Sequence, residues 1–253
     1  MTLKDLLVMI QKRGDCMVGN KVCFFQSLES TNSYMKKHLL SFCDGDIICA
    51  KVQTAGKGRR SNIWMSNNGD LHLSLYLDNT EKKDSIFDVI LMITNSLVKA
   101  LNIYNIDAKI KYPNDIVVGN RKIAGILVEH IIGEKDSFII GVGLNVVTED
   151  FSRIDKKGTS ILLETKQKID YRDVLQEFIS ALNELDVCKS CDLYNMYLDN
   201  SVVIGRNIVI DSESYYVKTI NLEGKVVLVK DEVEYVKHMN EISFKEYYDE
   251  LED

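Results

Sequence analysis

The feature that most constrains this chain is its single proline, Pro113, which lies in the segment Lys111-Tyr112-Pro113-Asn114-Asp115. Proline fixes its own backbone angle φ and disfavours helical geometry in the residue before it. The chain therefore bends here, between a short apolar run and a longer one. Lysine, asparagine and aspartate side chains lie at the bend, so it is a candidate binding site as well as a turn.

The longer apolar run, residues 121–129, is predicted to be a strand near the centre of a sheet, because both of its faces look buried. Lys122, at the start of a buried face, needs either an anionic partner or a route to water. From this segment alone, a lysine that simply reaches solvent is the commoner explanation. Regular alternation places Lys122, Ala124, Ile126 and Val128 on one face, and Ile123, Gly125 and Leu127 on the other.

The length of 253 residues suits one large domain, alone or with a small one. The net charge of −7 disfavours a general role in binding nucleic acids or membrane surfaces. Because Lys4 and Asp5 interrupt the first apolar segment and no apolar run reaches 18 residues, we expect no signal peptide and no membrane span. Among the six cysteines, Cys188 and Cys191 form a lone CxxC pair where a helical pattern ends. We expect reduced thiols in a cytoplasmic protein.

Hydrophobic periodicity predicts that the chain contains both helices and strands. Asp170 is a predicted helix cap. Short strands after Asn200 predict a second, β-barrel-like unit, so we expect domains at 1–200 and 201–253. The expected helices are 3–12, 32–40, 84–104 and 171–185, and the expected strands are 22–25, 46–52, 71–77, 109–111, 121–129, 137–146, 202–210, 215–222, 225–229 and 233–236.

The loop Gly56-Lys57-Gly58-Arg59-Arg60 offers flexible backbone and three cations to a phosphate or carboxylate. It matches neither a Walker A loop nor a complete GxGxxG motif. A solvated surface loop is an equally good explanation of the loop alone. Trp64, just beyond it, is either a core residue or a stacking surface for a ring.

The segment Gly141-Val142-Gly143-Leu144-Asn145 leaves one face of a predicted strand bare. Such glycines mark either a ligand or a close approach of the protein itself, through a bulge or tight helix packing. With Lys111 and Lys122, the loop cations make five positive charges in an acidic chain, which suits a nucleoside triphosphate together with a carboxylate. No Ser/His/Asp arrangement is visible, so catalysis is expected from charge neutralisation and positioning.

These motifs, together with Ser30-Thr31-Asn32, occur in an order and spacing that resembles the biotin protein ligases over about residues 22–248. The resemblance implies an α+β fold, in which a mixed β-sheet flanked by helices forms a catalytic core of the class II aminoacyl-tRNA synthetase and biotin ligase type. A small SH3-like domain follows this core. About twenty residues precede the first predicted strand, too few for the DNA-binding domain of the bifunctional members. The resemblance is therefore to the monofunctional type.

The resemblance implies two chemical steps. The carboxylate of biotin attacks the α-phosphate of ATP, with Mg²⁺ expected, to give biotinyl-5′-adenylate and pyrophosphate. A lysine of the biotin carboxyl carrier domain of a carboxylase then attacks this anhydride. The implied catalytic residues are Lys122, Arg59, Lys111 and Asp115; the implied biotin-binding residues are Ser30, Thr31, Asn32, Gln53, Lys57, Gly58, Arg59 and Lys122; and the implied nucleotide-binding residues are Arg60, Trp64, Lys111, Asn114 and Asn145.

Three positions depart from the family pattern: Lys57 replaces an arginine, Ser61 a glycine and Tyr112 a tryptophan. Lysine keeps the charge at position 57 but loses the bidentate fork. The competing interpretations are a lipoate-protein ligase, which shares the fold and acyl-adenylate chemistry, and a sensor of biotin or nucleotide without catalysis. Ser30 or Thr31 is also explained simply as a helix cap. No nucleic-acid or membrane partner is expected, and a homodimer is compatible with the sequence.

Overall fold

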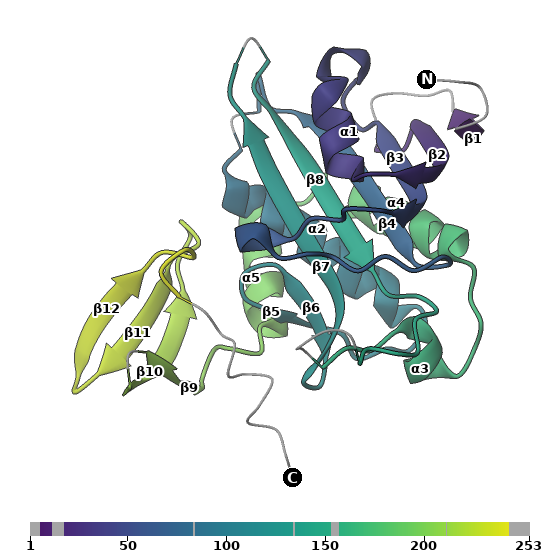
Figure 1. The fold of residues 1–253 in the computed structure, drawn as a ribbon. Coiled ribbons are helices and arrows are strands. Elements are labelled where there is room, and N and C mark those ends of the chain that lie inside the picture. Colours follow the sequence, from purple (N-terminus) through teal and green to yellow (C-terminus); the bar gives the residue numbers. More distant parts are fainter. Residues whose placement is uncertain are drawn as a thin grey trace.

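The computed structural model describes residues 6–11, whose backbone alone is considered, and residues 18–82, 84–133, 135–152, 157–210 and 212–242. Most of these residues surround one eight-stranded sheet in the order β1-β2-β3-β4-β8-β7-β6-β5 (Figure 1). Strands β2 and β3 are parallel and the other neighbours are antiparallel, so the sheet is mixed, as predicted. Its strands are β1 (Leu6–Gln11), β2 (Lys21–Leu28), β3 (Ile47–Gln53), β4 (Leu71–Asp78), β5 (Lys109–Lys111), β6 (Asp115–Val118), β7 (Arg121–Ile131) and β8 (Ser137–Leu144).

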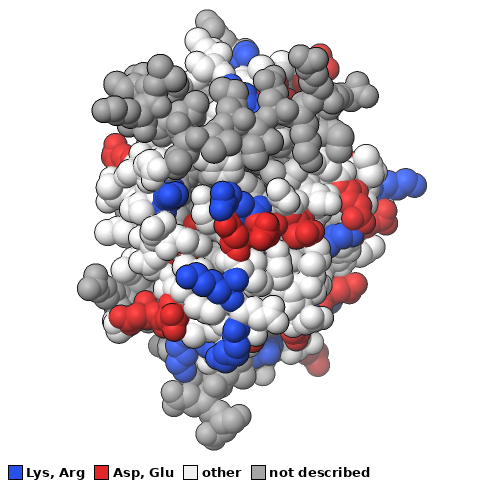
Figure 2. Space-filling model, turned by 90° about the vertical axis from the view of Figure 1, so that its right-hand side faces the viewer, with Lys and Arg blue, Asp and Glu red and all other residues white. Residues whose placement is uncertain are grey.

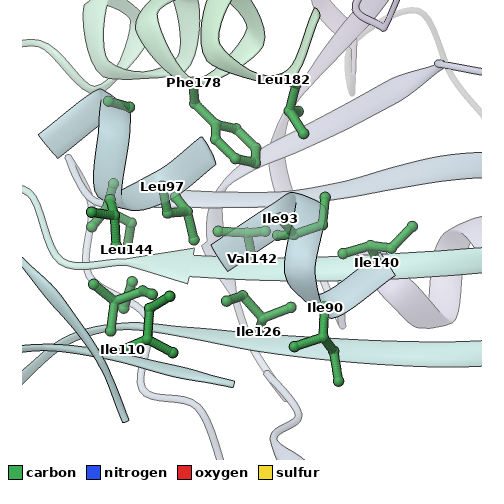
Figure 3. Packing of buried hydrophobic residues seen from close by; sticks show 14 of the residues in the cluster. Ile90, Ile93, Leu97, Ile110, Ile126, Ile140, Val142, Leu144, Phe178 and Leu182 are labelled. Atoms are coloured by element: carbon green, nitrogen blue, oxygen red, sulfur yellow. The ribbon is translucent and has the colours of Figure 1, made fainter. Parts of the chain in front are cut away.

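Helices cover both faces of this sheet. The larger core lies between the sheet and two helices, α2 (Ile86–Asn102) and α4 (Tyr171–Leu185), and Figure 3 shows how their apolar side chains meet those of the strands. On the other face, α1 (Thr31–Lys37) covers a smaller cluster around Met35. The side chains labelled in Figure 3 are Ile90, Ile93, Leu97, Ile110, Ile126, Ile140, Val142, Leu144, Phe178 and Leu182.

Polar caps fix the helix starts that periodicity predicts. Ser85 and Asp88 form a reciprocal capping box at the start of α2. Asp170 accepts a hydrogen bond from the backbone N–H of Arg172, which confirms it as the cap of α4. Ser30 caps α1 in the same way through the backbone N–H of Ser33. Two short helices complete the set, α3 (Ile161–Thr165) and α5 (Ser190–Asn200).

A second, four-stranded antiparallel sheet follows α5, in the order β12-β11-β10-β9. Ser201 pairs with Ile110 of the first sheet in an isolated parallel bridge, and the backbone N–H of Val202 donates to the carbonyl of Ile110, which ties the connection to that sheet. The division at residue 200 stays a prediction. The strands of the second sheet are β9 (Asn207–Ile210), β10 (Glu213–Ile220), β11 (Val226–Lys230) and β12 (Val233–Lys237).

Two predictions about local structure were wrong. The described part of the first predicted helix is strand β1, which pairs with β2, because a short continuous apolar run fits a buried strand as well as a helix. Cys188 and Cys191 do not end a helix: α4 ends at Leu185, and Cys191 lies in the first turn of α5, which the sequence did not reveal. Within the described part of the chain, the cysteines Cys23, Cys43, Cys49, Cys188 and Cys191 are free thiols.

The predicted alternation along β7 was wrong at Lys122. Ile116 of β6 pairs with Ala124, whereas Val117 pairs with Lys122, so Ile123 is an extra residue in a β-bulge. Ile123 and Ala124 are therefore both fully buried in the main core. The Nζ atom of Lys122 instead lies 2.8 Å from the point where Gly125 would carry a Cβ atom. The bulge moves the lysine onto the Gly125 face, the face opposite to the main core.

The distribution of surface charge and the length of the helices both relate to possible binding partners. On the face drawn in Figure 2, the basic and acidic side chains of described residues are interspersed and do not gather into one extended basic surface. No helix in the described ranges has the length and apolar character required to cross a bilayer.

Candidate functional site

A cavity of about 680 Å³ lies on the α1 side of the sheet, over the glycines of β7 and β8. The loop between β3 and β4 crosses in front of these two strands (Figure 1). All fourteen predicted site residues border this cavity, although they come from separate parts of the chain. They are Ser30, Thr31, Asn32, Gln53, Lys57, Gly58, Arg59, Arg60, Trp64, Lys111, Asn114, Asp115, Lys122 and Asn145.

Protein side chains fill the space beside Gly141 and Gly143 of β8. A Cβ atom on Gly143 would lie 2.2 Å from Cε2 of Trp64, and one on Gly141 would lie 2.6 Å from Oδ1 of Asn32. Both contacts are too close for any side chain larger than hydrogen. The glycines are therefore explained by the close approach of Trp64 and Asn32, and through these two residues they shape the cavity.

Lys122 has the anionic partner that its position requires. Its Nζ atom lies 2.6 Å from Oδ1 of Asp115, and both side chains are largely buried. The same ammonium lies 5.3 Å from the ring centroid of Trp64, within the range of a cation–π contact. The lysine thus stands between a carboxylate and an aromatic face at the edge of the cavity, where an incoming anion can meet it.

The bend at the proline presents its polar residues to the same space. Lys111 is only 4% exposed, and Asn114 accepts a hydrogen bond of 2.9 Å from Nη1 of Arg59. The hydroxyl of Tyr112 donates to the carbonyl of Gly224, so this departure from the family pattern ties the bend to the second sheet. Burial raises the pKa of Tyr112, which keeps the hydroxyl a donor. The Tyr112–Pro113 peptide bond is cis.

Two arginines of the loop bond to the chain beyond β12. Nη2 of Arg59 donates to the carbonyl of Met239, and Nη2 of Arg60 donates to those of Asn240 and Ile242 at 2.7 and 3.2 Å. Arg60 has a φ of 53°, a left-handed conformation that is uncommon outside glycine. Burial, and then the neighbouring charge of Arg60, lower the pKa of Arg59, and Asp115 opposes this shift. Arginine nevertheless stays protonated at neutral pH.

The cavity residues on α1, on β3 and at the start of the loop are held by hydrogen bonds. The backbone N–H and the hydroxyl of Thr31 both donate to Oε1 of Gln53, at 2.8 and 3.0 Å. Gln53 is held in turn because its backbone N–H donates to the hydroxyl of Ser66. The ammonium of Lys57 lies 3.0 Å from the hydroxyl of Ser33. Ser30 caps α1 and also borders the cavity.

Other cavity residues were missed from the sequence. Thr148 and Phe151 follow β8, and the carboxylate of Asp70 holds this loop by accepting from the backbone N–H groups of residues 146–148. The turn before Asp70, Asn67-Asn68-Gly69, was the available signal. Ile242 borders the cavity from the chain beyond the second sheet, and no sequence signal pointed to it. Asn145 is largely structural, with its amide bonded to the carbonyl of Thr159.

A family model and several curated proteins resemble this chain over about half of its length. The model of the biotin/lipoate A/B protein ligase family matches residues 24–145. The bifunctional ligase/repressor BirA of Escherichia coli is 32% identical over 132 residues, which are 51% of this chain and 41% of that protein. The biotin–[acetyl-CoA-carboxylase] ligase of Mycobacterium tuberculosis is 28% identical over 47% of this chain and 46% of its own length. The match thus spans less than half the length of these curated relatives.

Solved structures share the fold. The biotin protein ligase from Aquifex aeolicus in complex with biotin and ATP superposes with a TM-score of 0.75 at 21% identity, over 85% of this chain and 94% of that one. The biotin acetyl coenzyme A carboxylase synthetase from Helicobacter pylori, with bound biotinylated ATP, gives a TM-score of 0.59 at 21% identity, over 85% of this chain and 99% of that one. The predicted fold class, a mixed sheet flanked by helices with a small C-terminal β-sheet unit, is therefore confirmed. Residues 24–145, which include the motifs that meet in the cavity, are similar to the biotin/lipoate A/B protein ligase family.

Proposed function

We propose that this chain activates biotin with ATP to biotinyl-5′-adenylate and then transfers the biotinyl group to a lysine of a biotin carboxyl carrier domain. The observation that carries the proposal is the position of Lys122 in a cavity that it shares with Arg59, Lys111, Thr31 and Gln53. Arg59, Lys111 and Lys122 are cationic, whereas Thr31 and Gln53 are neutral and polar. This division suits an acid with an uncharged polar head group, whose carboxylate is joined to a phosphate.

The first step brings two anions together. A carboxylate oxygen of biotin forms a bond to the α-phosphorus of ATP, and the bond from that phosphorus to the bridging oxygen breaks, so that pyrophosphate leaves. Lys122 reduces the repulsion between the two anions, because its ammonium is largely buried and exchanges its contact with Asp115 for the ligand. Lys111 offsets the charge that builds up on the departing phosphates.

The second step needs a neutral amine. The amine of the carrier lysine attacks the acyl carbon, the bond from acyl carbon to phosphate oxygen breaks, and AMP leaves. Asp115, once Lys122 has turned to the ligand, is placed to accept the proton that the amine loses. Arg59 and its loop retain the adenylate and limit the access of water in the interval between the two steps.

Magnesium is proposed to enter as part of the ATP substrate. Within the described ranges no group of three His, Cys, Asp or Glu side chains is placed to hold a metal ion. Mg²⁺ is commonly bound through substrate phosphates and water with one or two protein carboxylates, and Asp115 and Asn114 border the cavity where the phosphates would lie. The free thiols of the described cysteines are consistent with a reducing compartment, and we propose the cytoplasm.

The proposal is tested by mass spectrometry of a purified biotin carboxyl carrier domain after incubation with the full chain, Mg²⁺, ATP and biotin. We expect the mass to increase by one biotinyl group, and no increase when the target lysine is replaced by arginine. Lipoate replaces biotin in a parallel reaction, because the matching family includes lipoate ligases. Transfer of lipoate in preference to biotin, or binding of biotin without any transfer, would contradict the proposal.

A further inference from the structure

A polar network extends from the cavity to the surface through Asn32 of α1, which is only 3% exposed. Ser74 of β4 pairs with Gly141 of β8, and the missing side chain of Gly141 leaves the space that the Asn32 amide fills. Glu129 of β7 and Lys36 of α1 complete the group. We name Asn32, Ser74, Glu129 and Lys36 the Asn32 network.

Three hydrogen bonds link the network, and the donors on both sides point toward Glu129. The hydroxyl of Ser74 donates to Oδ1 of Asn32 at 2.5 Å, and Nδ2 of Asn32 donates to Oε2 of Glu129 at 2.9 Å. The ammonium of Lys36 donates to the other carboxylate oxygen, Oε1 of Glu129, at 2.6 Å. Glu129 therefore connects a residue of the cavity wall to a half-exposed cation outside it.

The chemistry of these groups fixes the orientation of the amide. An ionised carboxylate only accepts hydrogen bonds, an ammonium only donates, and a hydroxyl does both. If the amide of Asn32 turned over, its oxygen would face the carboxylate of Glu129. The nitrogen is thus held toward Glu129 and the oxygen toward Ser74, and Asn32 keeps one N–H and one lone pair for a ligand.

We propose that Glu129 is a positioning residue, which selects the acid substrate by fixing which way the Asn32 amide points. This inference rests on the proposed function, and it adds that Asn32, which borders the cavity, meets the neutral head group of biotin. Glu129 is outside the set of residues that border the cavity, so it acts only through Asn32. With the amide fixed, the cavity wall presents a donor and an acceptor at set positions, and a head group with the complementary pattern binds best.

The substitution Glu129→Gln, which exchanges one carboxylate oxygen for an NH₂ group, is expected to reverse the orientation of the Asn32 amide. In Glu129→Gln, the ammonium of Lys36 attracts the new amide oxygen, so the new NH₂ group faces Asn32. Asn32 must then turn its oxygen toward residue 129 and its nitrogen toward Ser74, whose hydroxyl accepts instead of donating. The hydrogen bonds within the Asn32 network are kept and the fold is undisturbed. The cavity wall, however, now presents a donor at the position where the ligand requires an acceptor. Replacing Lys36 by methionine removes the ammonium that attracts the amide oxygen at position 129. That oxygen can then accept a hydrogen bond from Asn32 again.

The kinetic test compares KM values for biotin and for ATP in biotin-dependent pyrophosphate release by the full chain. Glu129→Gln is expected to raise KM for biotin about tenfold, the effect of about one mismatched hydrogen bond, with KM for ATP unchanged within twofold. Lys36→Met alone is expected to have little effect, and the double variant Lys36→Met/Glu129→Gln to recover a near-normal KM for biotin. Glu184→Gln, which alters a surface carboxylate paired with Lys99, is the matched control.

Recovery in the double variant separates positioning from mere support of the fold, since two destabilising changes would add. Unchanged KM for biotin in Glu129→Gln, an equal rise in KM for ATP, or no recovery in the double variant would each overturn the role of Glu129.

A second measurement is independent of the reaction. The side-chain NH₂ signals of Asn32 in a ¹⁵N–¹H spectrum of the ligand-free protein are expected to shift in Glu129→Gln and to return in the double variant. Signals that stay unchanged would overturn the network. If the wild-type chain releases no pyrophosphate with biotin, the proposed function fails, and the spectra still decide whether Glu129 orients Asn32.

Discussion

Trp64 packs so closely on Gly143 that a Cβ atom at position 143 would lie 2.2 Å from Cε2 of the indole. The indole also touches the position of a Cβ atom on Gly125 and lies under the ammonium of Lys122. One aromatic side chain from the loop thus meets two strands and the lysine of the proposed reaction. The glycines of β7 and β8 let the loop close onto the sheet.

The first prediction concerns this contact. Gly143→Ala is expected to displace Trp64, to lower the free energy of unfolding by about 1–3 kcal/mol through overpacking, and to raise KM for ATP, since Trp64 is one of the implied nucleotide-binding residues. Gly133→Ala is the matched control, because a Cβ atom on Gly133 meets nothing within 4 Å. Thermal unfolding and pyrophosphate-release kinetics measure both effects. Equal free energies of unfolding and equal KM values for ATP in the two variants would show that the contact between Trp64 and Gly143 affects neither stability nor ATP binding.

The second prediction concerns Arg59, which links the loop to Asn114 and to the carbonyl of Met239. Arg59→Gly is expected to release biotinyl-adenylate, so that lysines of an unrelated protein such as serum albumin become biotinylated. Arg59→Lys keeps the charge without the fork and should give intermediate labelling. The measurement is a streptavidin blot of the bystander protein. Labelling no greater than that by the wild-type chain would remove this role from Arg59.

The third prediction concerns pH and His72. Burial lowers the pKa of this imidazole below 6.5, against a smaller opposing effect of Asp70. The folded state therefore binds its proton less readily than the unfolded state, so stability is constant above about pH 6.5 and decreases as the pH falls through and below that value. His72→Asn should flatten this part of the profile. Urea unfolding between pH 7.5 and 5.5 measures the slopes, and parallel profiles for wild type and His72→Asn would contradict the assignment.

The fourth prediction concerns the cap of α4. Hydrogen bonds from the side chain and backbone of Arg172 lower the pKa of Asp170 to about 2. Its contribution is therefore present above pH 3.8 and is lost as the pH falls toward 2. At pH 7, Asp170→Ala should cost about 1 kcal/mol of stability, and Asp170→Asn, which keeps an acceptor, should cost less. Equal losses for the two variants in chemical unfolding would show that capping is not the cause.

Much of the fold could be predicted from the sequence where one physical pattern dominates. The apolar spacing of 84–104 produced α2 within two residues at each end, and Asp170 marked the start of α4. The candidate site could be predicted because its chemistry is concentrated in short polar motifs, and every residue chosen borders the cavity. The roles assigned to those residues remain predictions.

The structural features that the sequence did not predict depend on tertiary contacts, which leave no pattern in residue types. The bulge at Ile123 moves Lys122 to the other face of β7, and periodicity assumes that no extra residue is present. The acceptors for Arg59 and Arg60 are main-chain carbonyls of residues 239–242, which any sequence would provide. Strand β1 is decided by its pairing with β2, since its apolar run suits either structure.

The most direct test of the account is biotin-dependent pyrophosphate release by Lys122→Ala, compared with Lys99→Ala, which removes a surface ammonium paired with Glu184. Lys122→Ala is expected to lose nearly all activity while it stays folded, because the carboxylate and the α-phosphate then meet without a counter-charge and Asp115 adds a further negative charge beside them. Lys99→Ala is expected to retain wild-type activity. Near-normal pyrophosphate release by Lys122→Ala would contradict the central claim.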